Sequence, residues 1–288
     1  MLCVVALLVS CGGASASSDV AATGAAFSVP STVAMPVVKK DEPAIDVEHV
    51  ADGYVIACYK DSSRLKFQVS NGDAVYNYDL PNDGKPVVFP INMGDGAYLF
   101  RVMKNTDENN YVEVESAECN VKLTSEFVPF VIPNQFCDYD ESSACVAKAR
   151  ELVADADNQG EAVHRVCDYI VENIGYDVDK ARKLSKETGY IPNPDETLAQ
   201  GTGVCFDYAS LGAAMLRSLG FPTKIITGYV SPGDLYHAWI MVYVDGTWQT
   251  AEFSVSPDTW SRVDLTFAAS GGGEFTGNGT SYTDRYVY

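Results

Sequence analysis

A cysteine, a histidine and an aspartate follow one another in the second half of the chain, at Cys205, His237 and Asp264. A thiol nucleophile needs a base that accepts its proton and an acid that orients this base and stabilises its charged form. The three residue types supply these groups. We therefore expect chemistry in which a sulfur atom attacks an acyl carbon.

Cys205 opens an apolar segment that is typical of a buried helix ending at Gly220. It follows Gly201 and Gly203, which let a substrate backbone approach closely. In the first turn of a helix, unpaired backbone N–H groups and the helix dipole favour a thiolate over a thiol. We expect the pKa of Cys205 to be lowered, and we expect Asp207 to complement the dipole rather than to carry a proton.

His237 begins a segment that is typical of a strand and that runs to Val244. Asp245 and Gly246 then predict a type I′ turn into a second strand from Trp248. A histidine on a strand beside the start of the helix can pair with the thiol.

The orienting acid is expected on the strand that follows. Asp264 lies four residues after Trp260 and is the first choice. Trp248 and Glu252 repeat this spacing, so Glu252 is the alternative.

Three segments together resemble the core of the transglutaminase-like superfamily: GVCFDYASLGAAMLRSLGFPTKIITGYV, HAWIMVYVDGTW and WSRVDLTFAAS. The superfamily has G-x-C at a helix start, H-A-W on the next strand and W-x-x-x-D-P-T-F on the one after. The resemblance covers roughly residues 169–267 and implies that Cys205 is the nucleophile, His237 the base and Asp264 the acid. The chain departs from the pattern at Leu265, where proline is usual. DLTF at Asp264 favours this residue over Glu252, which FSVS follows.

The resemblance implies an α+β fold of papain-like character and an enzyme that cleaves an amide of a protein or peptide substrate through a thioester. Water would complete hydrolysis, as in a peptidase or amidase, whereas an amine would complete transglutamination, and the residues leave both open. The backbone N–H of Cys205 is expected in the oxyanion hole, with Gln200 as a candidate second donor. The alternative is a non-catalytic cell-surface binding or scaffolding protein that retains the fold. No cofactor or metal is implied.

The first residues resemble a bacterial lipoprotein signal. An apolar run ends in Leu8-Val9-Ser10-Cys11, although no Lys or Arg precedes it. Residues 1–11 are therefore expected to be a signal peptide and lipobox, with a lipid on Cys11 as the membrane contact. Residues 12–44, rich in Ala, Ser, Thr, Val and Pro, indicate a flexible tether. These features predict an extracytoplasmic protein that is anchored to the cell membrane or secreted.

Two domains are expected after the tether. Residues 45–127 alternate short apolar runs with turns, which predicts a small antiparallel β-sandwich of about seven strands. Its role stays open between a packing partner and a binding module. Residues 128–288 form the catalytic domain, with helices across 142–186, a loop over 187–203 that shapes one wall of the cleft, and a closing edge strand near the end.

Composition excludes some partners. The formal net charge is −19 and the pI is about 4.4, which opposes binding to nucleic acid or to an anionic lipid surface. Of eight cysteines, five remain after Cys3, Cys11 and Cys205, and none has C-x-x-C spacing. A structural zinc site is therefore not expected, and the disulfide pairing is left open, with Cys58 and Cys119 as one pair that could form across strands.

Overall fold

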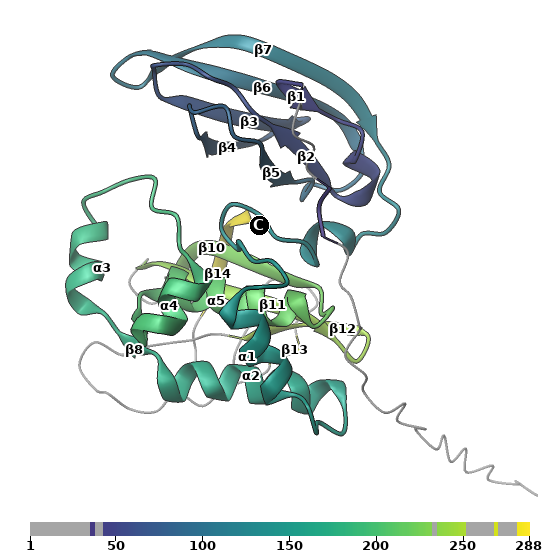
Figure 1. Ribbon diagram of the computed structural model, residues 1–288, viewed down its shortest axis with the longest axis vertical. Coiled ribbons are helices and arrows are strands. Elements are labelled where there is room, and N and C mark those ends of the chain that lie inside the picture. The colour runs from purple at the N-terminus through teal and green to yellow at the C-terminus, as the bar shows by residue number, and fades with distance from the viewer. Residues whose placement is uncertain (1–34, 38–42, 232–234, 252–267, 270–280) are drawn as a thin grey trace, which may run out of the picture.

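The computed structural model describes residues 35–37, 43–231, 235–251, 268–269 and 281–288. It has an all-β part and, below it in Figure 1, a part with both helices and a sheet. Cys11, predicted to carry a lipid, and the two candidate acids, Asp264 and Glu252, lie outside the described residues, so these assignments stay predictions. Among the described residues, no helix has the length and apolar character to cross a membrane.

The all-β part consists of two antiparallel sheets that share one core. The smaller sheet has the order β1-β2-β5: β1 (Ile45–Asp46), β2 (Tyr54–Ala57) and β5 (Val87–Pro90). The larger has the order β4-β3-β6-β7: β3 (Leu65–Asn71), β4 (Ala74–Leu80), β6 (Gly96–Asp107) and β7 (Asn110–Val121). Alternate side chains of β3 point inward, as a strand with one buried face requires, and Phe67 stacks on Phe89 and Phe100. The predicted sandwich is confirmed.

The C-terminal part is built on a five-stranded antiparallel sheet with the order β13-β12-β11-β10-β14. The strands are β10 (Thr223–Ser231), β11 (Leu235–Val244), β12 (Thr247–Ala251), β13 (Ala268–Ala269) and β14 (Ser281–Val287). Strand β14 lies at one edge, where the sequence predicts a closing strand. Helices and sheet in one domain confirm the α+β prediction.

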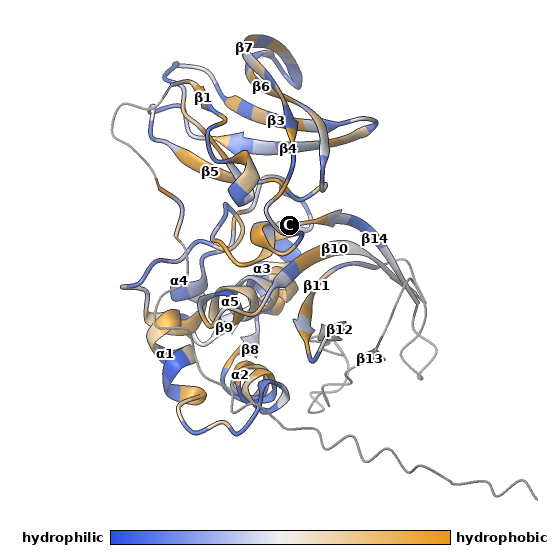
Figure 2. Cartoon of the chain, turned by 90° about the vertical axis from the view of Figure 1, so that its right-hand side faces the viewer, coloured by the Kyte–Doolittle hydropathy of each residue, from blue (hydrophilic) through white to orange (hydrophobic). Residues whose placement is uncertain are grey.

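Helices cover one side of this sheet, as Figure 2 shows for α1, α2, α4 and α5. Their bounds are α1 (Ala144–Leu152), α2 (Gln159–Asn173), α3 (Val178–Leu184), α4 (Pro194–Gln200) and α5 (Cys205–Ser218). The short strands β8 (Gly175–Tyr176) and β9 (Thr202–Gly203) lie between these helices and pair with each other in parallel. The 3-10 turn η1 (Val50–Asp52) lies between β1 and β2, and η2 (Val128–Phe130) lies between β7 and α1.

Helix α5 is the centre of the domain, because it packs on β10 and β11 with α1, α2 and α4 around it. Twelve of its 14 residues are buried, which explains why its sequence is apolar on all sides. The helix ends where the sequence predicts, since Gly220 has a φ of +83° and releases the chain into β10.

The segment 187–203, predicted as a loop, contains the helix α4. Asn193 caps it by accepting the N–H of Glu196 at 3.0 Å, and Pro194 occupies its first turn. Asp195 also caps the neighbouring helix α1, because its carboxylate accepts the N–H groups of Ala144 and Cys145 at 3.0 and 2.8 Å. The turn residues in this segment therefore mark a helix boundary rather than a continuous loop.

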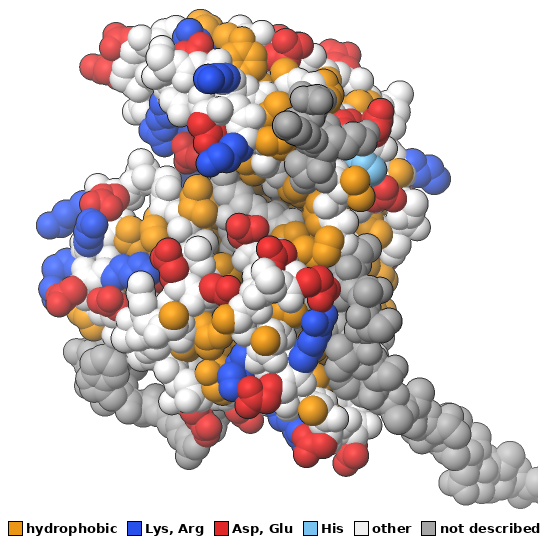
Figure 3. Space-filling view, viewed as in Figure 1, with side chains coloured by type: hydrophobic (Ala, Val, Ile, Leu, Met, Phe, Trp, Pro, Cys, Tyr) orange, Lys and Arg blue, Asp and Glu red, His pale blue; other side chains and the backbone are white. Residues whose placement is uncertain are grey.

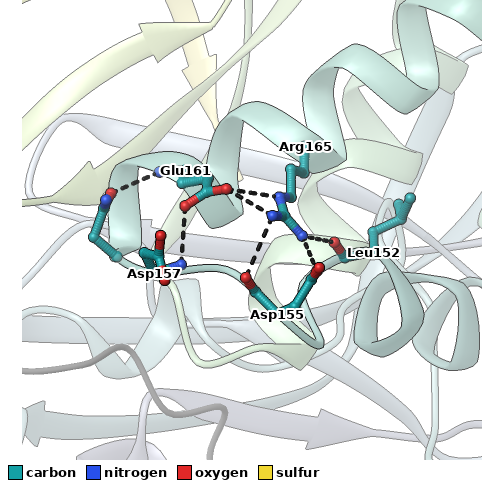
Figure 4. Close-up of polar contacts among 6 residues, drawn as sticks. Leu152, Asp155, Asp157, Glu161 and Arg165 are labelled. Atoms are coloured by element: carbon teal, nitrogen blue, oxygen red, sulfur yellow. Dashed lines mark hydrogen bonds and ion pairs between the residues drawn. The ribbon is translucent and has the colours of Figure 1, made fainter.

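A group of charged residues fixes the connection between α1 and α2 (Figure 4). Arg165 forms ion pairs with Asp155 and with Glu161, the latter at 2.6 Å, and it donates to the carbonyl oxygen of Leu152 at 3.3 Å. Glu161 also accepts the N–H of Asp157 at 2.9 Å. One guanidinium thus connects the end of α1 to the start of α2.

All six described cysteines are free thiols. Cys58 and Cys119 are therefore not joined, and the Sγ of Cys58 instead donates to the carbonyl oxygen of Pro43 at 3.3 Å.

Candidate active site

Cys205 is the first residue of α5 and lines a pocket of about 610 Å³. The preceding residue, Val204, has an extended backbone (φ −103°, ψ 174°), so the chain enters the helix directly at the sulfur-bearing residue. His237 lies within β11 and lines the same pocket. The structure therefore brings together two of the three residues that the sequence singles out.

The position of His237 follows from the pairing of the sheet. His237 stands opposite Gly228 of β10, and the β11–β12 hairpin turns at Asp245 and Gly246 with φ angles of +51° and +80°. Positive φ at both central residues is the type I′ geometry that the sequence predicts. The histidine is thus held within a strand that pairs on both sides.

Burial controls the charge of both groups. It raises the pKa of the Cys205 thiol, although the N–H groups of Ala238 and Phe206 oppose this effect at the sulfur. It also lowers the pKa of His237 to about 4. The expectation of a lowered pKa at Cys205 is wrong, because desolvation of the thiolate outweighs the backbone N–H groups of the helix start. At neutral pH the two groups therefore form a thiol and a neutral imidazole.

Aromatic side chains make up much of the pocket wall. They come from elements far apart in the sequence: Phe136, Tyr176, Tyr190, Phe206, Tyr236 and Tyr288. Glu187 is the one carboxylate among the described lining residues. A wall of this composition suits an apolar group of a ligand.

Asp207 is a structural residue whose role the sequence does not reveal. It is fully buried, and its Oδ2 accepts the N–H of Val204 at 2.8 Å. The same oxygen lies 2.7 Å from the Nζ of Lys180, and Oδ1 accepts the hydroxyl of Tyr190 at 2.5 Å. The assignment of Asp207 to the helix dipole alone is thus incomplete, since its carboxylate also ties the start of α5 to α3 and to the pocket wall.

The signal for this network was an acid in the first turn of α5, but its partners could not be inferred. Lys180 lies in α3, and Tyr190 lies in the segment after it. The Nζ of Lys180 also lies 4.8 Å from the centre of the Tyr190 ring. The prediction that Gln200 is the second donor of the oxyanion hole is wrong, because the side chain of Gln200 is exposed and does not line the pocket.

The β-sandwich supports the pocket wall at Tyr288, which lies between the two parts of the molecule (Figure 1). The rings of Tyr76 and Phe136 contact its ring, with centres 5.7 and 4.5 Å away. Asn92 donates to the carbonyl oxygen of Val287 at 2.5 Å, and the N–H of Val287 donates to the hydroxyl of Tyr76 at 3.0 Å. The sandwich is therefore a packing partner of the active-site wall.

Within the described residues, no three side chains of His, Cys, Asp or Glu are grouped so that they could hold a metal ion.

Residues 146–264 match the family model of the transglutaminase-like superfamily. A UPF0252 protein of Methanocaldococcus jannaschii is 26% identical over 165 residues, which are 52% of this chain and 45% of that protein. An uncharacterised protein of Mycobacterium leprae is 32% identical over 88 residues, which are 25% of this chain and 32% of that protein. The chain thus spans less than half the length of these curated relatives.

Two solved structures are similar over a larger share of the chain but at low identity. A candidate cysteine protease from Cytophaga hutchinsonii is 18% identical, covers 69% of this chain and 74% of its own, and has a TM-score of 0.38. Red sea bream transglutaminase is 12% identical, covers 69% of this chain and 47% of its own, and has a TM-score of 0.26. These scores add nothing to the family match.

The matched segment begins in α1, includes Cys205 and His237, and ends at Asp264. It therefore contains the central helix, the strand that carries the histidine and the first-choice acid. Residues 146–264 of this chain are thus similar to the core of the transglutaminase-like superfamily, and this similarity supports a cysteine-dependent enzyme at the level of the superfamily.

Proposed function

We propose that this protein is a cysteine-dependent enzyme that acts on an amide bond of a peptide or protein. One observation carries the proposal: Cys205, at the start of a buried helix, and His237, on the adjacent strand, line one pocket. Acyl transfer requires a nucleophile that attacks the acyl carbon and a nearby base that accepts the proton of the nucleophile and gives it to the leaving group. The superfamily match supports this assignment.

The neutral state of both groups determines how the first step proceeds. As the Sγ of Cys205 attacks the amide carbon, its proton passes to the imidazole of His237, so that the ion pair forms only in the transition state. The backbone N–H of Cys205 is the donor proposed for the oxyanion. His237 then gives the proton to the leaving amine, and a thioester remains on Cys205.

An acid beside His237 would stabilise the imidazolium during this step. Asp264 is the proposed residue, with Glu252 as the alternative, and this choice depends on the sequence pattern. An acid in this role orients the ring and stabilises its charged form without accepting the proton itself.

Hydrolysis is the proposed outcome of the second step, because water needs no binding site of its own to reach the thioester. In this second step, His237 removes a proton from water as the water oxygen attacks the carbon of the thioester. His237 then gives a proton to the sulfur of Cys205, and the carboxylic acid and the free thiol are released. A primary amine in place of water would give a new amide instead.

The test uses p-nitrophenyl acetate, which acylates a catalytic thiol without any specific binding. The wild-type protein should release p-nitrophenol in a burst equal to the enzyme concentration, followed by slower turnover. Cys205→Ala should abolish the burst, and His237→Ala should slow it at least 100-fold. Adding a primary amine such as glycine ethyl ester then shows whether aminolysis competes with water.

Cys119→Ser is the matched control, because Cys119 is a partly exposed free thiol on β7, in the sandwich. This variant should retain the full burst. A wild-type protein with no burst, or a burst that survives Cys205→Ala, would exclude the enzyme and favour the scaffolding alternative.

A further inference from the structure

A second pocket, of about 600 Å³, lies where the sandwich meets the α+β domain. The sandwich contributes Pro86, and the segment between the two parts contributes Pro133 and Asn134. Residues near α4, including Pro192 and Glu196, complete the wall. The catalytic proposal does not use this pocket.

The second pocket adjoins the pocket of Cys205, because consecutive residues line one and then the other. Gln135 lines the second pocket and Phe136 the first. In the same way, Tyr190 lines the first pocket and Ile191 the second. The same two chain segments therefore form walls of both pockets.

The second pocket is acidic. Asp138 and Glu196 are two carboxylates among its described lining residues, which include no Lys, Arg or His. Neither carboxylate forms an ion pair with a described cation. Burial and the nearby carboxylates of Asp140 and Asp195 raise the pKa of Asp138. Figure 3 shows acidic side chains gathered below the hollow between the two parts of the molecule.

A buried amide in the wall has a hydrogen-bond donor without a partner. Asn134 is only 4% exposed; its Oδ1 accepts the N–H of Phe136 at 2.9 Å, whereas its Nδ2 has no partner in the described part of the chain. The next residue, Gln135, donates to the carbonyl oxygen of Asp79 at 2.5 Å and leaves its own Oε1 without a partner there. A buried polar group without a partner costs stability, so these atoms point to a ligand that offers both an acceptor and a donor.

We infer that this second pocket binds a basic, extended segment of the polypeptide substrate. The inference rests on the proposed function, because it places this segment beside the amide that Cys205 attacks. A peptide backbone supplies a carbonyl oxygen that can accept from the Nδ2 of Asn134 and an N–H group that can donate to the Oε1 of Gln135. Proline rings in the wall offer flat apolar surfaces to an extended chain, and a Lys or Arg side chain neutralises Asp138 and Glu196.

Binding is measured by fluorescence anisotropy on the Cys205→Ala protein, which cannot turn the probe over. The probes are a lysine- and proline-containing hexapeptide with blocked ends and a version in which glutamate replaces lysine. We expect the lysine peptide to bind at least tenfold more tightly at low salt, with a preference that shrinks as salt screens the charges. Equal affinity for the two peptides would overturn the inference.

The decisive variant combines Asp138→Asn with Glu196→Gln, which removes both carboxylates named in the pocket wall, and should weaken the binding of the lysine peptide at least fivefold. The matched control combines Asp73→Asn with Asp168→Asn, which removes two exposed acids far from the pocket and should leave the affinity unchanged. An equal loss in both double variants would mean general attraction to an acidic protein and would overturn the site. These binding measurements need no catalysis. If the protein bound the peptide but showed no acylation burst, the binding site would be supported and the proposed enzyme activity would be overturned.

Discussion

The hydroxyl of Tyr190 donates to the Oδ1 of Asp207 at 2.5 Å, although the two residues are 17 positions apart in the chain. Tyr190 belongs to the wall of the Cys205 pocket, and Asp207 belongs to the first turn of the helix that begins at Cys205. The contact therefore fixes the position of the wall relative to the nucleophile. Lys180 neutralises the buried carboxylate from the other side, at 2.7 Å.

Asp207→Asn should destabilise the fold by about 2–3 kcal/mol, because the amide leaves Lys180 without its charge partner and cannot reproduce both accepted hydrogen bonds. Tyr190→Phe should cost less, about 1 kcal/mol, since it removes one hydrogen bond. Urea denaturation measures both, and the acylation burst of Asp207→Asn should slow as the wall shifts. Asp179→Asn, on an α3 side chain that is 91% exposed, is the control and should change neither quantity. Equal stability of Asp207→Asn and wild type would contradict the assigned role.

The rate at which iodoacetamide alkylates Cys205 should increase steadily with pH, up to and beyond pH 9. This pH is the ordinary pKa of a cysteine thiol. Burial raises the pKa of Cys205, so the thiolate population at pH 7 is smaller than that of an exposed cysteine. Intact-mass labelling followed by peptide mapping gives the rate at each pH. A plateau of fast labelling between pH 5 and 7 that disappears in His237→Ala would show a thiolate–imidazolium pair and contradict the neutral resting state.

The stability of the fold should decrease as the pH falls from 6.5 to about 4, partly because of His237. Burial lowers the pKa of this residue to about 4 in the folded state, whereas 6.5 is its ordinary value. Between these two values the unfolded chain binds a proton that the folded chain does not, and below 4 this contribution no longer changes. Its upper limit is about 3.5 kcal/mol, at about 1.4 kcal/mol for each pH unit.

The comparison of wild type with His237→Gln isolates this contribution from that of the carboxylates, which titrate in the same range. The difference in free energy of unfolding between the two proteins should change as the pH falls from 6.5 to about 4, by no more than the upper limit given for His237. His49→Gln, in the sandwich, is the control. A constant difference between wild type and His237→Gln would show that His237 is not buried in its neutral form.

Arg217 should be one of the most sensitive positions for stability. It is fully buried and donates to three backbone carbonyl oxygens, those of Thr223, Ile132 and Tyr288, at 2.8, 2.8 and 2.9 Å. Arg217→Leu should cost about 3–5 kcal/mol, because three buried carbonyl groups lose their donors at once. Arg217→Lys should recover part of this loss, since an ammonium group can reach some of the same oxygens.

Thermal and urea unfolding measure these losses. Arg182→Leu, which removes an exposed ion pair with Asp179, should cost less than about 1 kcal/mol. If Arg217→Leu and Arg182→Leu had similar effects, the three carbonyl contacts would not contribute to stability.

The sequence by itself determined most of the larger elements, though not the helix α4, and it singled out the two residues that line the pocket together. Short apolar runs separated by turn signals predicted β3 and its neighbours, because such runs are typical of the strands of a small antiparallel sandwich. The all-round apolar character of the segment after Cys205 predicted a buried helix, and Asp245-Gly246 predicted the hairpin that carries His237. These signals are local, so they can be read without knowing the fold.

The tertiary structure decided the quantities that depend on contacts between distant segments. Whether Cys205 is a thiol or a thiolate depends on how much water the surrounding chain excludes, and here desolvation outweighs the helix start. The partners of Asp207 come from α3 and the segment after it, and Tyr288 reaches the pocket because the sandwich holds it there. The acidic pocket exists only where the sandwich meets the α+β domain, so no local pattern in the sequence could predict it.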